Sequence, residues 1–305
     1  MGEMKRASKT AVACYGFGEL ASQLVWMYVG SYLTIFYTDI VGLAPVAIST
    51  IMLMARVLDI VIDPMVGALA ERTRSGLGRF RPWFLYGCPF FALIGILTFT
   101  NPFSGGSIVG ILWAAGTYIL TGIMFSVVNI PYGAMATVMS EDANQRTILN
   151  SFRTIGTQLG MLIVNGVTAV LALHFSAEGA KVADRHGYMM TAVVYGLLVI
   201  PLFLIVFKTS KEVIQPKEKP DSFSFKNAIE NLVKNKYLML VSLIMILVMT
   251  AVMGRMSVVA FYVIYCLGSY KLISLVMVIP SICAILVSFV VPSLTKKFGK
   301  RNVLM

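Results

Sequence analysis

The chain has 305 residues, of which 58% are hydrophobic and 13% are charged, and its mean hydropathy is +0.82. Soluble domains carry roughly 45–50% apolar and about 25% charged residues, so one soluble core cannot hold this excess and lipid must be the solvent for most of the chain. The net charge of +11 would suit a nucleic-acid-binding protein, but the basic residues are scattered over short loops between apolar runs, which excludes that class.

Eight apolar runs are long enough to cross a membrane, since a spanning helix needs about 20 mostly apolar residues. The first run is too long for the hydrophobic region of a signal peptide and lacks a small-residue cleavage site, so it is interpreted as a spanning helix. We expect spans at about 12–38, 44–70, 83–101, 108–138, 149–173, 187–207, 237–267 and 272–294.

A charged stretch separates the sixth expected span from the seventh, as in six-plus-six transporters, where a linker joins two bundles. The domains expected are therefore a six-helix bundle at 1–207, a cytoplasmic linker at 208–236 and the beginning of a second bundle at 237–305. Residues 302–304 are expected to open a ninth helix, and the chain is expected to be a truncated or partial form of a protein of about twelve helices. Within the linker, 222–236 fits an amphipathic surface helix and a poorly ordered segment equally well.

The basic residues predict the orientation. With the N-terminus placed in the cytoplasm, 19 of the 25 Lys and Arg fall on the cytoplasmic side, whereas Lys181, Arg185 and Lys271 fall outside. Such a bias is the positive-inside pattern of multi-pass membrane proteins. We therefore expect a protein of the cytoplasmic (inner) membrane with a cytoplasmic N-terminus.

Ionisable side chains inside a bilayer are costly, so each one indicates a functional site. In the second span Arg56, Asp59 and Asp63 share one helical face, because they lie three and seven residues apart. Two carboxylates one turn apart repel each other, and a bound cation, a shared proton or Arg56 relieves that repulsion. We predict a cation site at Asp59 and Asp63 with Arg56 as neighbour, and the alternative is an ion-pair network that locks helices together.

Three other spans carry polar side chains suited to a sugar. They are Glu19 and Gln23 in the first span, Ser126 and Asn129 in the fourth, and Arg153 in the fifth. Amide and guanidinium groups form the paired hydrogen bonds that sugar hydroxyls require. Any one of these residues alone is better explained by hydrogen bonding between helices, but polar faces on several spans favour a substrate site.

The loop between the second and third spans carries arginines at the helix ends, where they can pair with carboxylates and terminal carbonyls. We predict that this loop is a cytoplasmic gate, and the alternative is that the arginines only anchor the helix ends at the cytoplasmic surface. The arginines are Arg72, Arg74, Arg79 and Arg81.

The small-residue pairs Gly106–Gly110 and Gly156–Gly160 predict close helix packing.

Several short segments carry a family resemblance: YGFG (15–18), FYTDIVGL (36–43), ARVLD (55–59), DPMVG (63–67), RTRS through FRPW (72–83), NIPYGA (129–134) and FGKRN (298–302). In these segments the chain resembles the glycoside–pentoside–hexuronide:cation symporters of the major facilitator superfamily. The resemblance implies an all-α integral membrane protein with the transporter fold of that superfamily. The complete N-terminal six-helix bundle would be present, with the first two helices and the start of a third from the C-terminal bundle.

The resemblance also implies symport of a glycoside, pentoside or hexuronide with H⁺ or Na⁺ by alternating access. The cation would bind at Asp59 and Asp63. No cofactor and no metal other than Na⁺ is expected, and the protein would be a monomer when full length, with a sugar and membrane lipid as its partners. An enzyme is not expected, because no nucleophile–base pair or metal cluster can be assembled from the sequence.

The chain departs from the melibiose-transporting members of the family at informative positions. Gln23 and Asn129 stand where those members have sugar-binding aspartates, whereas Arg153 matches their helix-five arginine. Ile62 replaces a cation-site asparagine, which weakens the case for Na⁺ and leaves both H⁺ and Na⁺ open, and Gly133 replaces a sugar-pocket tryptophan. Because amides repel an acidic sugar less than carboxylates do, and Arg153 can attract one, a hexuronide is compatible with this pocket.

Two other functions stay open on the sequence. The polar faces can be purely structural, in which case the protein is a non-transporting membrane sensor or a partner subunit. The same fold can also carry another amphiphile, such as a lipid, through a more apolar pocket.

Overall fold

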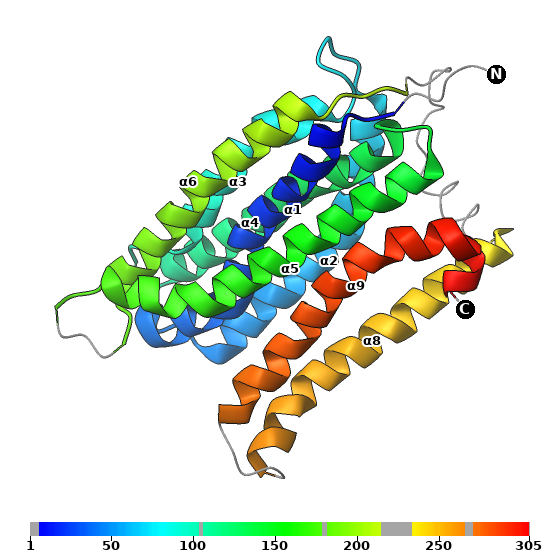
Figure 1. Ribbon diagram of the computed structural model, residues 1–305. Helices are drawn as coiled ribbons and strands as arrows, with labels where there is room; N and C mark the ends of the chain where they lie inside the picture. Colours follow the sequence, from blue (N-terminus) through cyan, green and yellow to red (C-terminus); the bar gives the residue numbers. More distant parts are fainter. Residues whose placement is uncertain (1–5, 104–105, 179–181, 215–233, 266–270, 305) are drawn as a thin grey trace. The chain divides into compact units, whose positions relative to one another are not determined.

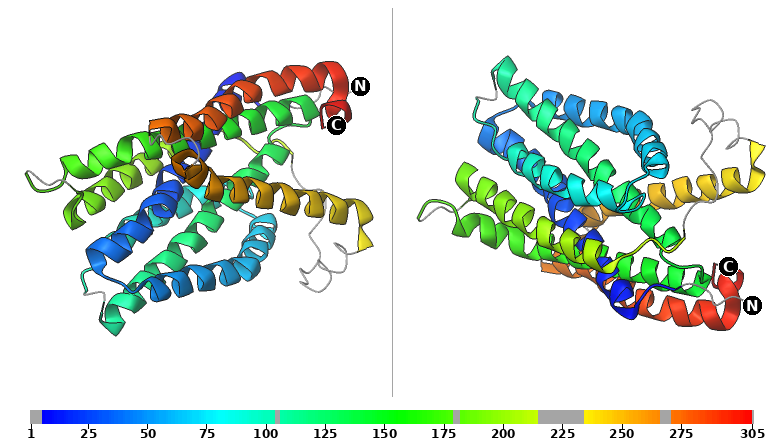
Figure 2. Two further views of the ribbon diagram at one scale, coloured as in Figure 1. Left: turned by 90° about the horizontal axis from the view of Figure 1, so that it is seen from below. Right: turned by 90° about the horizontal axis from the view of Figure 1, so that it is seen from above.

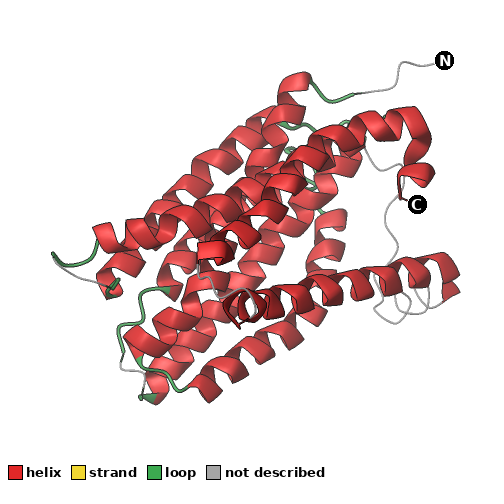
Figure 3. Ribbon diagram, turned by 60° about the horizontal axis from the view of Figure 1, so that its bottom comes forward, coloured by secondary structure: helices red, strands yellow, loops and turns green. Residues whose placement is uncertain are grey.

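A computed structural model of the protein describes residues 6–103, 106–178, 182–214, 234–265 and 271–304 (Figure 1). All regular elements in these ranges are helical, which confirms the predicted all-α class (Figure 3). In chain order they are α1 (Lys9–Ile35), η1 (Phe36–Val41), α2 (Pro45–Arg72), α3 (Arg81–Thr98), α4 (Ile108–Val138), α5 (Ala143–His174), α6 (Arg185–Thr209), α8 (Lys236–Tyr265) and α9 (Lys271–Leu304).

Six helical segments in the described ranges are long and apolar enough to cross a membrane, and they coincide with the first six predicted spans. They are Lys9–Val41, Pro45–Arg72, Arg81–Thr98, Ile108–Val138, Ala143–His174 and Arg185–Thr209. The seventh and eighth predicted spans correspond to α8 and α9. Residues 302–304 belong to α9, not to a separate helix, because the Lys- and Arg-rich turns that end the apolar run are themselves good helix formers.

The chain divides into two compact units, Met1–Lys217 with Ala284–Met305, and Glu218–Cys283. Helices α1 to α6 all belong to the first unit, and so does every residue predicted for the cation and sugar sites. The amphipathic linker helix considered at 222–236 falls almost entirely outside the described residues. The predicted domain boundaries stay a prediction.

Polar caps extend helices beyond their apolar runs. The Asp142 side chain accepts a hydrogen bond from the Asn144 backbone N–H at 2.8 Å, and α5 therefore begins at Ala143, six residues before the predicted span. At the start of α1, the Ser8 hydroxyl accepts from the Ala11 N–H at 3.1 Å. Hydropathy finds the apolar part of a helix and misses such polar first turns.

Within the first unit, the helices form two groups. α1 packs mainly against α5 and α6, whereas α4 packs against α2 and α3, and α3 also contacts α6. Figure 2 shows α5 and α6 (green) on one side of the bundle and α2, α3 and α4 (blue to teal) on the other. Because α1 also touches α4, polar side chains of α1, α4 and α5 can meet inside the bundle.

Glycine allows α1 and α5 to approach backbone to backbone. A Cβ added to Gly156 would overlap the Gly16 carbonyl oxygen, and one added to Gly160 would come within 2.6 Å of Gln23 Cβ. The close packing predicted for the Gly156–Gly160 pair is therefore confirmed. Gly106, by contrast, has nothing within 4 Å of its added Cβ, so the expectation of close packing there was wrong.

We expect Gly156→Ala to destabilise the bundle strongly, because the obstructing atom is a backbone oxygen that cannot turn aside. Overpacking costs typically about 1–3 kcal/mol, and a backbone clash falls at the upper end. Gly166→Ala is the matched control on the same helix, since nothing lies within 4 Å of its added Cβ. Thermal unfolding in detergent should show a clear loss for the first variant only. Equal melting temperatures would contradict the close approach of α1 and α5.

Candidate functional site

Four predicted sugar-binding side chains form one hydrogen-bonded cluster centred on Glu19. Arg153 Nε donates to Glu19 Oε2 at 2.6 Å, and Gln23 Nε2 donates to Glu19 Oε1 at 3.1 Å. Arg153 Nη2 also donates to Asn129 Oδ1 at 3.0 Å, and Asn129 Nδ2 lies 3.4 Å from both Glu19 oxygens. Glu19 is only 5% exposed, so its charge depends on these partners.

One glycine and a tyrosine pair shape the surroundings of this cluster. A Cβ on Gly133 would lie 2.7 Å from Arg153 Nη1, so the glycine that departs from the family pattern makes room for the guanidinium. Tyr15 Oη donates to the Tyr132 carbonyl at 2.5 Å, and Tyr132 Oη donates back to the Tyr15 carbonyl. These reciprocal bonds fix α1 against α4 beside the cluster.

The predicted cation residues lie on the face of α2 that meets α4. Arg56 Nη1 and Asp59 Oδ2 form an ion pair at 3.1 Å, and Arg56 Nη2 also donates to Tyr118 Oη at 3.2 Å. Ser126 Oγ donates to Asp63 Oδ1 at 2.5 Å. Ser126, expected among the sugar-binding residues, is therefore placed beside the predicted cation site. No group of three or more His, Cys, Asp or Glu suited to a metal ion occurs among the described residues.

Helix α4 connects the two clusters. Tyr118, Gly122, Ser126 and Asn129 follow one another at spacings of four, four and three residues, so they share one face. Tyr118 contacts Arg56, Gly122 faces Asp59, Ser126 bonds Asp63 and Asn129 bonds Arg153. The two clusters are therefore joined through one face of a single helix, about one turn apart.

An aromatic side chain that sequence reasoning missed lies between the clusters. Trp26 stacks on Phe125 with ring centroids 4.4 Å apart, and the Arg56 guanidinium lies 5.3 Å from the Trp26 ring centroid. Trp26 lies three residues after Gln23 and therefore on the same face of α1. The helical spacing that groups Glu19 with Gln23 could also have identified Trp26 from the sequence.

The predicted gating arginines have different surroundings. Arg81 donates to the Phe207 carbonyl at 2.7 Å and to the Leu77 carbonyl at 3.2 Å, which ties α3 to α6, and Arg79 lies over the Phe80 ring. Arg72 and Arg74 are exposed. The contacts of Arg81 lie within the first unit, and a gating role for the loop stays a prediction.

Glu212, also missed by the sequence analysis, organises the same loop. Its carboxylate accepts hydrogen bonds from the backbone N–H groups of Arg79, Phe80 and Arg81 at 2.8, 2.7 and 3.2 Å. A carboxylate at these orphan amides compensates the positive end of α3. Gly78, at φ 110°, leaves space for it, since an added Cβ would lie 2.6 Å from Glu212 Oε1. No sequence signal links residue 212 to residue 79, because the contact depends on the path of the chain after α6.

We expect Glu212→Ala to expose the amides of residues 79–81, because three donors lose their acceptor. An unsatisfied buried donor costs about 1–3 kcal/mol, which corresponds to roughly tenfold or more faster amide exchange. Hydrogen exchange read by mass spectrometry on a peptide covering the loop checks this, with Lys211→Gln as the neighbouring control. Unchanged protection would show that Glu212 does not hold the loop.

Comparison with known proteins identifies the family. The chain matches the family described as MFS/sugar transport protein over residues 14–305. It is 32% identical to the inner membrane symporter YicJ of Escherichia coli over 84% of this chain and 54% of that protein. It is 27% identical to the isoprimeverose transporter of Lactiplantibacillus pentosus over 95% of this chain and 60% of that protein.

A third relative, the glucuronide carrier protein homolog of E. coli, is 26% identical over 98% of this chain and 64% of that protein. The chain thus spans less than two thirds of the length of these three relatives. It belongs to the MFS/sugar transport protein family of multi-pass membrane transporters, which confirms the family, the fold class and the expectation that it is not an enzyme.

Proposed function

We propose that the protein takes part in secondary active symport of a sugar with a cation by alternating access. The observation that carries the proposal is the position of the Glu19–Gln23–Asn129–Arg153 cluster one turn of α4 away from the Ser126–Asp63 contact. Two polar clusters that share a helix provide the linkage a symporter needs, because each ligand must favour the state that binds the other. The relatives named for isoprimeverose and glucuronide support a sugar.

A neutral glycoside or pentoside fits the sugar cluster better than a hexuronide. Arg153 is already paired with Glu19 at 2.6 Å, so the cluster offers no uncompensated positive charge to a sugar carboxylate. The cluster supplies amide and carboxylate groups for hydroxyls, and Trp26 supplies an aromatic face on the adjacent turn. A polar cluster of this kind also favours a sugar over an apolar amphiphile.

The coupling ion proposed is H⁺, bound at Asp63. Asp59 is engaged by Arg56, which leaves Asp63 as a carboxylate with one hydroxyl donor, Ser126. A single carboxylate suits a proton, whereas a hard metal cation requires several oxygen ligands. We place the protein in the inner membrane, with the basic loops on the cytoplasmic side.

The test is sugar transport into proteoliposomes that hold the protein purified from its native membrane. A panel of labelled neutral glycosides, pentoses and hexuronides is offered under an imposed H⁺ gradient, an imposed Na⁺ gradient or neither. Accumulation of a neutral sugar under the H⁺ gradient alone is expected. Accumulation only under Na⁺ would change the ion assignment. Sugar binding without counterflow would favour the sensor function and overturn transport.

A further inference from the structure

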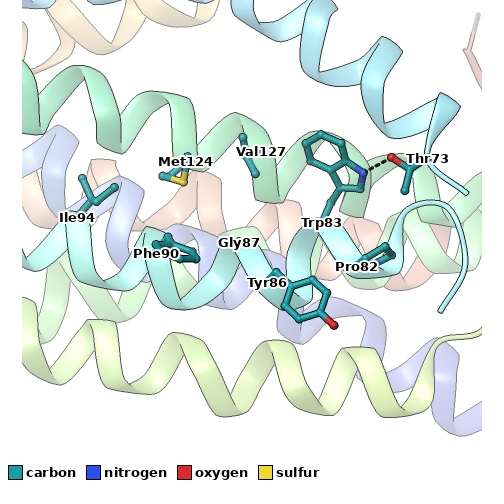
Figure 4. Close-up of a pocket in the computed structure, with 9 residues that line it drawn as sticks. All are labelled: Thr73, Pro82, Trp83, Tyr86, Gly87, Phe90, Ile94, Met124 and Val127. Atoms are coloured by element: carbon teal, nitrogen blue, oxygen red, sulfur yellow. Dashed lines mark hydrogen bonds between the residues drawn. The ribbon is translucent and has the colours of Figure 1, made fainter. Parts of the chain in front are cut away.

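An apolar groove of about 470 Å³ lies on the surface of the first unit along α3 (Figure 4). The α3 residues that line it run from Pro82 to Ile94, with Met124 and Val127 from α4 and Thr73 just beyond α2. The lining side chains are apolar or aromatic apart from Thr73, and the volume falls within the range of about 300–1,000 Å³ typical of small-molecule sites.

The groove has the dimensions of one membrane leaflet. The thirteen residues from Pro82 to Ile94 span about 18 Å of helix, whereas half of the hydrocarbon core is about 15 Å. At one end Trp83 Nε1 donates to Thr73 Oγ1 at 2.8 Å, an arrangement typical of a tryptophan at the membrane–water interface. Tyr86 and Phe90 are 63% and 59% exposed, so the groove is open along its side.

Four arginines lie close in the chain to the Thr73 end of the groove. Arg72 and Arg74 flank Thr73 in the chain and are exposed, and Arg79 and Arg81 precede Pro82. With the two carboxylates Glu71 and Glu212 included, the formal charge of residues 71–82 together with Glu212 is +2. This positive charge lies at one end of an apolar groove. That pairing complements a lipid with an anionic headgroup.

The groove is separate from the proposed transport site. At 100° per residue, Met124 and Val127 lie on the face of α4 opposite to Gly122, Ser126 and Asn129. A ligand in the groove therefore contacts the face of α4 that carries Met124 and Val127, and it does not enter either polar cluster.

We propose that this groove binds an anionic diacyl phospholipid. One acyl chain lies along α3 between Trp83 and Ile94, and the headgroup phosphate lies at Arg72 and Arg74. The inference does not depend on the identity of the sugar or of the coupling ion.

Quenching of Trp83 fluorescence tests the proposal. The protein is placed in phosphatidylcholine nanodiscs with a small fraction of phosphatidylglycerol or phosphatidylcholine carrying dibrominated chains. The contribution of Trp83 is the difference between the parent protein and Trp83→Phe. Half-maximal quenching is expected at a fivefold or more lower fraction of the brominated phosphatidylglycerol, since each basic residue near the headgroup contributes roughly fivefold.

The double variant Arg72→Gln/Arg74→Gln should lose this preference, whereas Arg146→Gln, on α5, should keep it. Equal quenching by the two brominated lipids would mean ordinary annular contact and would overturn the proposal. A preference that survives the double variant would overturn the assignment of the headgroup. All the substituted arginines are surface or interfacial residues, and the lipid comparison itself requires no variant.

Discussion

Asp63→Asn is expected to abolish cation-driven sugar accumulation while sugar exchange across the membrane continues. The amide has the size of the carboxylate and can still accept the Ser126 hydrogen bond, which measures 2.5 Å in the parent. It cannot take up a proton or balance a cation. In proteoliposomes with a pH gradient of one unit, which supports about tenfold accumulation at most, the accumulation ratio should fall to one.

Ser126→Ala is the matched control, because it removes the hydroxyl donor and keeps the carboxylate. We expect this variant to keep cation-driven accumulation, because the carboxylate that takes up the proton is still present. Wild-type accumulation by the Asp63 variant would show that the cation is not bound there. If the variant lost both accumulation and exchange but kept the wild-type melting temperature, Asp63 would be assigned to sugar binding and not to cation coupling.

Removing one member of the Glu19–Arg153 pair is expected to cost roughly 3–5 kcal/mol of stability, because the other charge is left buried without its partner. Both Glu19→Gln and Arg153→Met should therefore lower the melting temperature in detergent. Each should also abolish sugar binding, since each removes a group from the cluster that holds Gln23 and Asn129 in place.

The double variant Glu19→Gln/Arg153→Met separates structure from function. It leaves no unpaired charge, and most of the lost stability should return. A pair that serves only to join α1 to α5 would recover sugar uptake together with the melting temperature. A binding pair would recover stability alone, which is the result expected here. Recovery of uptake would remove both residues from the proposed sugar site.

The spans could be predicted because a membrane requires long apolar helices, and the first six predicted spans coincide with helices α1 to α6. Contacts within one helix could be predicted for a similar reason. The spacing of Arg56 and Asp59 predicted a shared face, and the two residues form an ion pair at 3.1 Å. Helical periodicity is a local property and can be read from the sequence.

Contacts between helices could not be predicted in detail, because they depend on how each helix is rotated about its axis. Ser126 and Asn129 are three residues apart on α4, yet one bonds Asp63 of α2 and the other bonds Arg153 of α5. Glu19 was predicted as one of five sugar-binding residues, and the structure places it at the centre of the cluster. Its central role follows from the close approach of α1 and α5 at Gly16 and Gly156.

The two ion pairs have an electrical consequence for the proposed cycle. Glu19 with Arg153 and Arg56 with Asp59 each sum to zero, so among the residues of the two clusters Asp63 carries the uncompensated charge. With a proton on Asp63 and a neutral sugar bound, the loaded carrier crosses without net charge movement in these clusters. The membrane potential would then act on the return of the empty carrier, at about 2.3 kcal/mol per 100 mV. The membrane potential would therefore set the turnover rate by acting on the return of the empty carrier. Over a full cycle, one charge would cross the membrane for each sugar molecule transported.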